Sequence, residues 1–178
     1  MGKKFLKQVL WILLLLLWAV LFSKAFALDS EANRATLKGL VGVRVLVEDI
    51  APEVEKSGLS KSRLQSIIEL KLKKTGIKVL TQEEVLRTPG EPYLYLNINA
   101  ATGKTQPHLY MYSIDLALIQ NIVLERDPKA STYGITWSTG GVGLIEGEAL
   151  KQLSENILGM LDLFIEAYQS ANKAKAKP

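Results

Sequence analysis

The chain has 178 residues, of which 48% are hydrophobic and 22% are charged, and it contains one histidine and no cysteine. This length suits one domain, or one domain preceded by a targeting segment. The lack of cysteine excludes disulfides, thiolate metal sites and a cysteine nucleophile, and a single histidine excludes a multi-histidine metal site. We therefore expect no cofactor and no metal.

The first 27 residues have the pattern of a secretory signal peptide. Three lysines precede an uncharged apolar run at 9–22, and the small-residue pattern Ala25-Phe26-Ala27 follows it. As a helix, this run would span about 21 Å, which is less than the roughly 30 Å of a bilayer's hydrocarbon core. We predict cleavage after Ala27 and a periplasmic or otherwise extracytoplasmic location. An uncleaved anchor in the inner membrane is the alternative.

Cleavage would remove the net positive charge. Four of the 22 basic residues and none of the 18 acidic residues lie within 1–27, so the remaining chain carries 18 residues of each sign. Nucleic-acid binding requires a basic surface that neutralises phosphates, and the mature chain has none. We expect no nucleic-acid partner, and contact with a membrane only through the signal segment if it is not cleaved.

The mature chain is expected to form one domain. A polar, flexible lead-in is predicted at 28–38, the domain itself at 39–171, and a flexible basic tail at 172–178. A chain of this size can bury about two-thirds of its unfolded surface, so one hydrophobic core is sufficient to fold it.

The first half of the domain has the pattern of a strand, a helix and a second strand. Alternating valines at 41–47 predict the first strand. Apolar residues at helical spacing over 64–72 predict a helix between an N-cap at Ser60 and a C-terminal Gly76. A short strand is predicted at 77–80, and a right-handed crossover would make the two strands parallel.

The second half predicts a short helix, three long strands and a long final helix. The short helix begins with a capping box at 81–84. Alternating residues at 93–100, 109–126 and 133–137 predict an antiparallel meander. Apolar residues at helical spacing over 150–168 predict the final helix.

This order, β-α-β-(short α)-β-β-β-α, predicts an α/β fold of the α+β kind. It is a two-layer sandwich in which both long helices cover one face of a mixed sheet. The other sheet face is left open, and tyrosine and methionine on it favour contact with a partner. An ordinary solvated face is the alternative. The residues expected on this face are Leu46, Tyr93, Tyr95, Asn97, Asn99, Met111, Ser113, Asp115 and Ile119.

No catalytic residue is predicted. Asp115 lies seven residues from His108 on the same predicted strand, about 23 Å away and on the opposite face, so it cannot orient a histidine base. The glycine-rich stretch at 139–143 does not complete a nucleotide-binding fingerprint and is interpreted as a tight bend or bulge. Glu48 and Asp49 are interpreted as a solvated strand end.

Two further residues in the predicted strands have structural interpretations. Gln120 interrupts an apolar face, so it is expected to bond a backbone group if it is buried. Tyr133, Ile135 and Trp137 stand at every second position of the predicted strand. This spacing predicts that Trp137 lies in the core.

Several short segments resemble a family of small exported bacterial proteins of unknown function. They span most of residues 37–168, and they are the segments at 40–43, 69–72, 75–80, 89–94, 126–128 and 136–138, together with Gln120. More remotely, the order of elements resembles the α/β domain at the front of the Tol–Pal β-propeller protein and in the curli-secretion channel family. This resemblance implies a role in envelope assembly or partner binding.

The sequence therefore predicts an exported, non-catalytic cell-envelope protein. We expect it to act as an interaction or assembly module that binds another envelope protein or a second copy of itself. A periplasmic carrier of a small molecule or lipid is the alternative. An enzyme that uses carboxylates alone is a further alternative.

Overall fold

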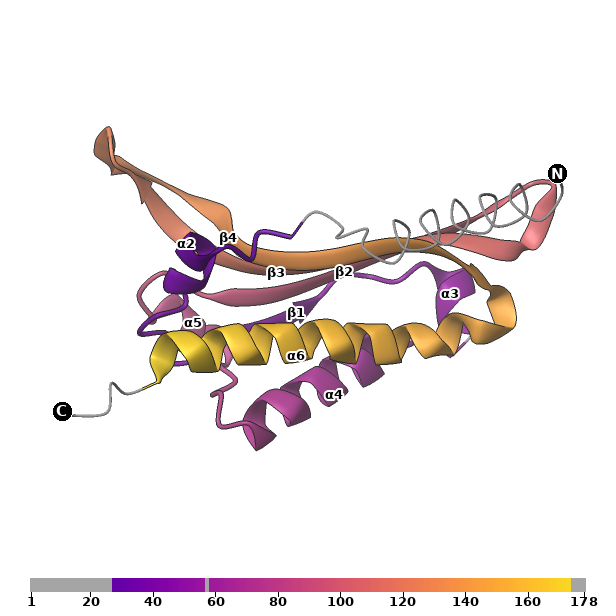
Figure 1. Cartoon of the computed structure of the whole chain (residues 1–178), viewed down its shortest axis with the longest axis horizontal. Coiled ribbons are helices and arrows are strands. Elements are labelled where there is room, and N and C mark those ends of the chain that lie inside the picture. Colours follow the sequence, from indigo (N-terminus) through magenta and orange to yellow (C-terminus); the bar gives the residue numbers. More distant parts are fainter. Residues whose placement is uncertain (1–26, 57, 174–178) are drawn as a thin grey trace, which may run out of the picture.

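The computed structural model describes residues 27–56 and 58–173, so the predicted signal segment up to Phe26 and the tail from residue 174 lie outside it. The described chain has an α+β fold with one mixed sheet (Figure 1). The strands follow in the order β1 (Arg44–Val47), β2 (Tyr93–Gly103), β3 (Gln106–Leu124) and β4 (Asp127–Glu146). The shorter helices are α2 (Glu31–Ala35), α3 (Pro52–Lys56), α5 (Gln82–Leu86) and the 3₁₀ helix η1 (Gly147–Gln152).

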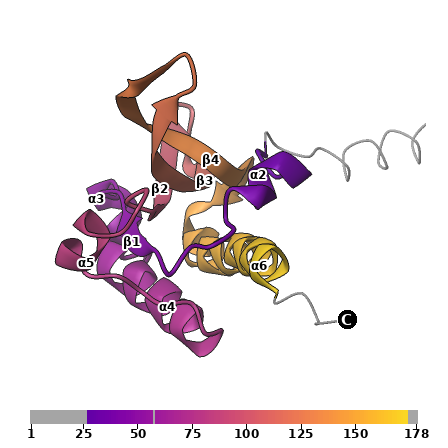
Figure 2. The same cartoon turned by 90° about the vertical axis from the view of Figure 1, so that its left-hand side faces the viewer.

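The two long helices, α4 (Lys61–Lys74) and α6 (Leu153–Asn172), lie on one side of the sheet (Figure 2). Their apolar stripes pack with the sheet's buried face into one core, in which Trp137 and Phe164 are fully buried and meet edge to face at 5.3 Å. This arrangement confirms the predicted two-layer sandwich. α4 ends as expected, because Gly76 adopts a φ of +81° that other residues rarely reach.

The sheet contains the predicted antiparallel meander, but its parallel pair joins the first strand to the strand at 93–103 and not to the segment at 77–80. β1 pairs in parallel with β2, and β2, β3 and β4 follow one another in antiparallel register. The strand predicted at 77–80 is reduced to one parallel bridge between Val43 and Val79. The chain then turns at once into α5, whose N-cap Thr81 accepts a hydrogen bond from the backbone of Glu84.

The prediction of a bend or bulge at 139–143 is wrong, because these residues continue β4 in regular pairing with β3. Glycine is needed there for close packing rather than for a turn. A Cβ on Gly140 would lie 2.7 Å from the carbonyl oxygen of Ile114, and one on Gly143 would lie 2.8 Å from the ring of Tyr112. β4 therefore runs straight to η1 without changing direction.

A β-bulge lies instead at Thr136. Leu118 pairs with Trp137, and the next residue of β3, Ile119, pairs with Ile135, so Thr136 is the extra residue of β4. A shift of one residue in the pairing register moves the side chains of a strand to the opposite face of the sheet. Trp137 is fully buried as predicted, whereas Ile135 is 54% exposed on the opposite face.

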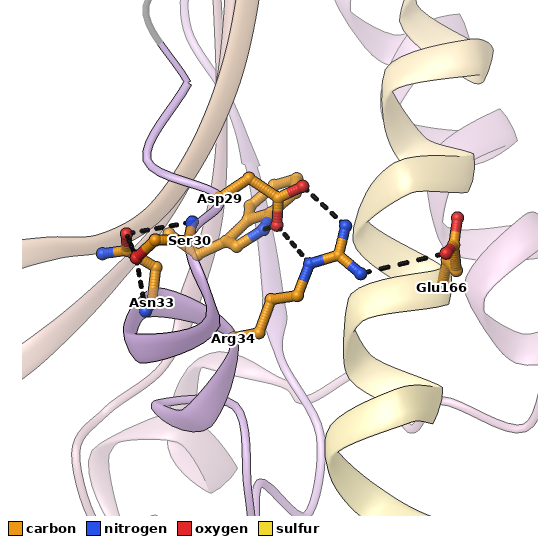
Figure 3. A network of polar contacts seen from close by, with 6 residues as sticks. Asp29, Ser30, Asn33, Arg34 and Glu166 are labelled. Carbon is orange, nitrogen blue, oxygen red and sulfur yellow. Dashed lines mark hydrogen bonds and ion pairs between the residues drawn. The ribbon is translucent and has the colours of Figure 1, made fainter.

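A packed helix occupies the segment predicted as a flexible lead-in. Ser30 and Asn33 form a capping box at the start of α2, and Leu37 is fully buried in the core. Asp29 accepts hydrogen bonds from Arg34 and from the indole of Trp137, all at 2.7 Å (Figure 3). These contacts attach the segment to β4, and Leu28 pairs with Ser138 of that strand.

Candidate interaction surface

The sheet face turned away from α4 and α6, here called the open face, gathers every residue that the sequence places on it. Register sets Leu46 beside Tyr95 and Tyr93 beside Ile119. The same register continues through further pairs along the face, which are Asn97 with Asp115, Asn99 with Ser113, and Ala101 with Met111. The predicted contact residues therefore form one surface across three strands.

The centre of the open face is polar and acidic. Asp115 is exposed beside the half-buried Asn97. The Tyr95 hydroxyl donates a 2.9 Å hydrogen bond to the carboxylate of Glu48. Desolvation, helped by this neighbouring carboxylate, raises the pKa of Tyr95. Hydrogen-bonding groups at the centre of a surface orient a partner more than they add affinity.

One end of the open face, here called the tyrosine end, consists of Tyr93, Ile119, Tyr133 and Ile135. The rings of Tyr93 and Tyr133 meet edge to face at 6.3 Å. The Tyr133 hydroxyl donates to the carboxylate of Glu91, and this bond raises the pKa of Tyr133 to about 12. Tyr133 and Ile135 have the same spacing as the buried Trp137, but the bulge turns them to this face.

The bulge that creates the tyrosine end is held by side chains of β3 and α2. Gln120 donates hydrogen bonds to the Thr136 hydroxyl at 2.8 Å and to the carbonyl of Thr36 at 3.4 Å. Asn33 of α2 donates to the carbonyl of Thr136 at 2.9 Å. Gln120 thus has the structural bonding that the sequence predicts, and the lead-in helps to set which β4 residues face outward.

The other end, here called the methionine end, consists of Met111, Val142 and Leu144. These side chains are 65%, 79% and 64% exposed. Val142 was missed because 139–143 was interpreted as a bend, and Leu144 was missed because the predicted strand ended before that bend. An open hollow of about 980 Å³ borders this end, lined mostly by apolar groups of β2, β3, β4 and the chain before α3.

The histidine and acidic residues considered as catalytic candidates do not lie together in the structure. His108 is exposed near the start of β3. It lies on the opposite face of the strand from Asp115, because an odd number of positions separates the two residues. Asp49 pairs with Lys61 at 2.5 Å, and this bond lowers the pKa of Asp49. Within residues 27–56 and 58–173, no three histidine, aspartate or glutamate side chains group as metal ligands would.

The fold and surface define an α+β protein in which helices cover one face of a mixed sheet and the other face is uncovered. Over the described part of the chain, no helix combines the length and the apolar character needed to cross a membrane. No protein-family model matches the sequence, and a search of curated proteins finds no match. The resemblance to small exported bacterial proteins therefore stays a prediction.

Proposed function

We propose that this chain is an exported cell-envelope protein that acts by binding another envelope protein through the open face, without catalysis. The observation that supports this function is the pair of exposed apolar ends on that face. Aromatic residues and methionine are enriched in protein interfaces, and contiguous exposed apolar groups mark interaction sites. A partner would place apolar side chains on both ends and hydrogen-bond donors near Asp115.

The experiment is crosslinking in living cells, followed by identification of the captured protein. Tyr95→Ala and Met111→Asp should reduce its recovery at least about tenfold, because each alters the proposed contact surface. Leu70→Asp is the matched control, since Leu70 is 53% exposed on α4, in the opposite layer. Equal recovery from the Met111 and Leu70 variants would contradict binding through the open face.

Export is tested separately by the mass and cellular location of the accumulated protein. Cleavage after Ala27 should leave a chain that begins at Leu28 and is released with the periplasmic fraction. An intact precursor free in the cytosol would contradict the proposed location.

The hollow at the methionine end supports a second candidate function, the transport of a small apolar molecule or lipid. Its volume of about 980 Å³ is at the upper end of the range for ligand sites, and its lining is largely apolar. Native mass spectrometry of protein purified without detergent would show a retained ligand if the carrier function holds. A mass equal to that of the polypeptide alone would count against it.

A further inference from the structure

We propose that the free edge of β4 at 139–145 pairs with the same edge of a second copy, in antiparallel orientation, around a two-fold axis at Val142. This pairing goes beyond the proposed function, because it would hold even if the open face bound no other protein. It would join the two sheets into one continuous eight-stranded sheet, from two sheets of four strands each.

Over this stretch, none of the described residues pairs with the outer edge of β4. β4 is the last strand of the sheet, and the described chain pairs with its outer edge only at Ser138, whose N–H donates to the carbonyl of Leu28 at 3.2 Å. Backbone groups alternate in direction along a strand, so those of Gly140, Val142 and Leu144 also point outward. Among the described residues, these three outward N–H groups have no acceptor.

The edge also lacks the features that normally prevent pairing. Natural edge strands carry charges, prolines or bulges that block the addition of another strand. The stretch at 139–145 contains no charged residue and no proline, and the register shifts of β4 lie elsewhere, at Thr136 and near the turn after Leu124. This segment is therefore an uncharged and regularly paired template for a further strand.

The features of this stretch favour a second copy as the occupant. The free stretch begins next to the Leu28 contact and ends before Glu146, so Val142 is its midpoint. Antiparallel pairing about this midpoint sets Val142 opposite itself and Gly140 opposite Leu144, with about six backbone hydrogen bonds. No charged residue then faces another across the seven-residue pairing.

The two faces of the paired strands are also complementary. On the open face, the exposed Val142 and Leu144 of both copies would form one apolar cluster. On the helix face, Gly141 would lie opposite Gly143, so the Met160 and Tyr112 side chains beside these glycines meet no new side chain. A pairing of this size buries less than the roughly 800 Å² per partner of a standard interface. We expect a dissociation constant on the order of micromolar.

Engineered cysteines test the register, since the natural chain has none. Hydrogen-bonded residues opposite each other have Cα atoms about 5.5 Å apart, a distance that a disulfide bridges. Val142→Cys should therefore form a covalent dimer on mild oxidation. Leu144→Cys, similarly exposed on the same strand, would lie about 13 Å from its own copy and should crosslink at least tenfold less. Equal crosslinking of the two variants would overturn this register.

Sedimentation of the protein in the form that the cell accumulates tests the dimer itself, from about 1 to about 100 µM. The wild type should change from monomer to dimer, and Val142→Lys should stay monomeric because two like charges would face each other. Ile135→Lys adds the same charge to an exposed site of β4 outside the pairing and should still dimerise. Circular dichroism checks that both variants fold.

A wild type that stays monomeric over this range would overturn the proposal. This outcome includes the case in which residues before Leu28 cover the edge of β4 and prevent the pairing. A Val142→Lys protein that still dimerises would overturn it as well. Val142 and Ile135 belong to the two ends of the open face, so the two interfaces are separated with Tyr95→Ala, which changes that face on β2, outside the pairing. A Tyr95→Ala protein that loses partner capture and still dimerises would separate the β4 interface from the proposed function.

Discussion

The indole N–H of Trp137 donates a 2.7 Å hydrogen bond to the carboxylate of Asp29, which lies 108 residues earlier in the chain. The same carboxylate holds Arg34 through two further bonds, and Arg34 reaches Glu166 of α6 at 3.8 Å (Figure 3). One side chain therefore joins the N-terminal segment to β4 and, through Arg34, to the last helix.

We expect Asp29→Ala to lower the free energy of unfolding by about 1–3 kcal/mol, because it leaves the buried Trp137 N–H without its acceptor. Urea denaturation measures this change. Asp49→Ala is the control, since Asp49 forms an exposed ion pair with Lys61 that solvent screens and that should contribute little to stability. Equal losses in the two variants would show that the Trp137 bond adds no particular stability.

Ile135→Asp tests the reversal of facing at the bulge. With Ile135 on the open face, this substitution should change stability by no more than about 0.5 kcal/mol. Without the bulge, Ile135 would lie in the core beside Trp137, and a carboxylate there would prevent folding. Leu118→Asp, in the fully buried neighbour of the bulge, should abolish the cooperative unfolding transition. Chemical denaturation followed by tryptophan fluorescence distinguishes these outcomes.

Two glycine substitutions test the close packing of β4 against β3. Gly140→Ala should destabilise the fold by roughly 1–3 kcal/mol, because the added Cβ would meet the backbone of Ile114 at 2.7 Å. Gly159→Ala, at an open position within α6, should stabilise it by about 0.4–1 kcal/mol. Thermal and urea unfolding measure both. If Gly140→Ala were neutral, close packing would not explain the glycine.

The contact between Tyr133 and Glu91 predicts a change at alkaline pH. The pKa of Tyr133 is raised from 10.0 to about 12 in the folded state, so the contact stabilises the fold below about pH 10. As the pH rises from 10 to 12, Tyr133 ionises more readily in the unfolded chain, and this contribution is lost. Tyr133→Phe should not show this loss in urea titrations at matched pH values.

Tyrosinate absorbance checks the cause of the Tyr133 shift. Glu91→Gln replaces the carboxylate that accepts the Tyr133 hydrogen bond with a neutral amide, so the pKa of Tyr133 should fall toward 10. The difference between each spectrum and that of Tyr133→Phe assigns the signal to this residue. An unchanged titration in Glu91→Gln would show that the carboxylate does not raise the pKa.

Features that depend on near neighbours in the chain could be predicted from the sequence. The helix after Ser60 and its end at Gly76 follow from local spacing and from glycine's access to positive φ. The alternation over 93–100 identifies the buried and open faces of β2, because side chains on a strand alternate strictly. The residues predicted to contact a partner therefore lie together on the open face.

The Thr136 bulge and the straight course of β4 could not be predicted in this way. Tyr133, Ile135 and Trp137 are all large and apolar, so their alternation continues across the bulge without a visible break. The glycines at 140 and 143 resemble turn residues until Tyr112 and Ile114 of β3 are placed against them. One local signal for α2 was overlooked, since Ser30 and Asn33 have the spacing of its capping box.

By itself, the sequence determined the two long helices, the faces of β2 and the two-layer class, because side chains on one face recur about every 3.6 residues in a helix and every 2 residues in a strand. Only the tertiary structure decided where β4 turns its side chains to the opposite face and which of its edges the other described strands leave unpaired. Those features depend on bonds between segments about a hundred residues apart, such as that of Asn33 with the Thr136 carbonyl. The backbone position that accepts such a bond is set by the packing of the whole sheet and not by local preference.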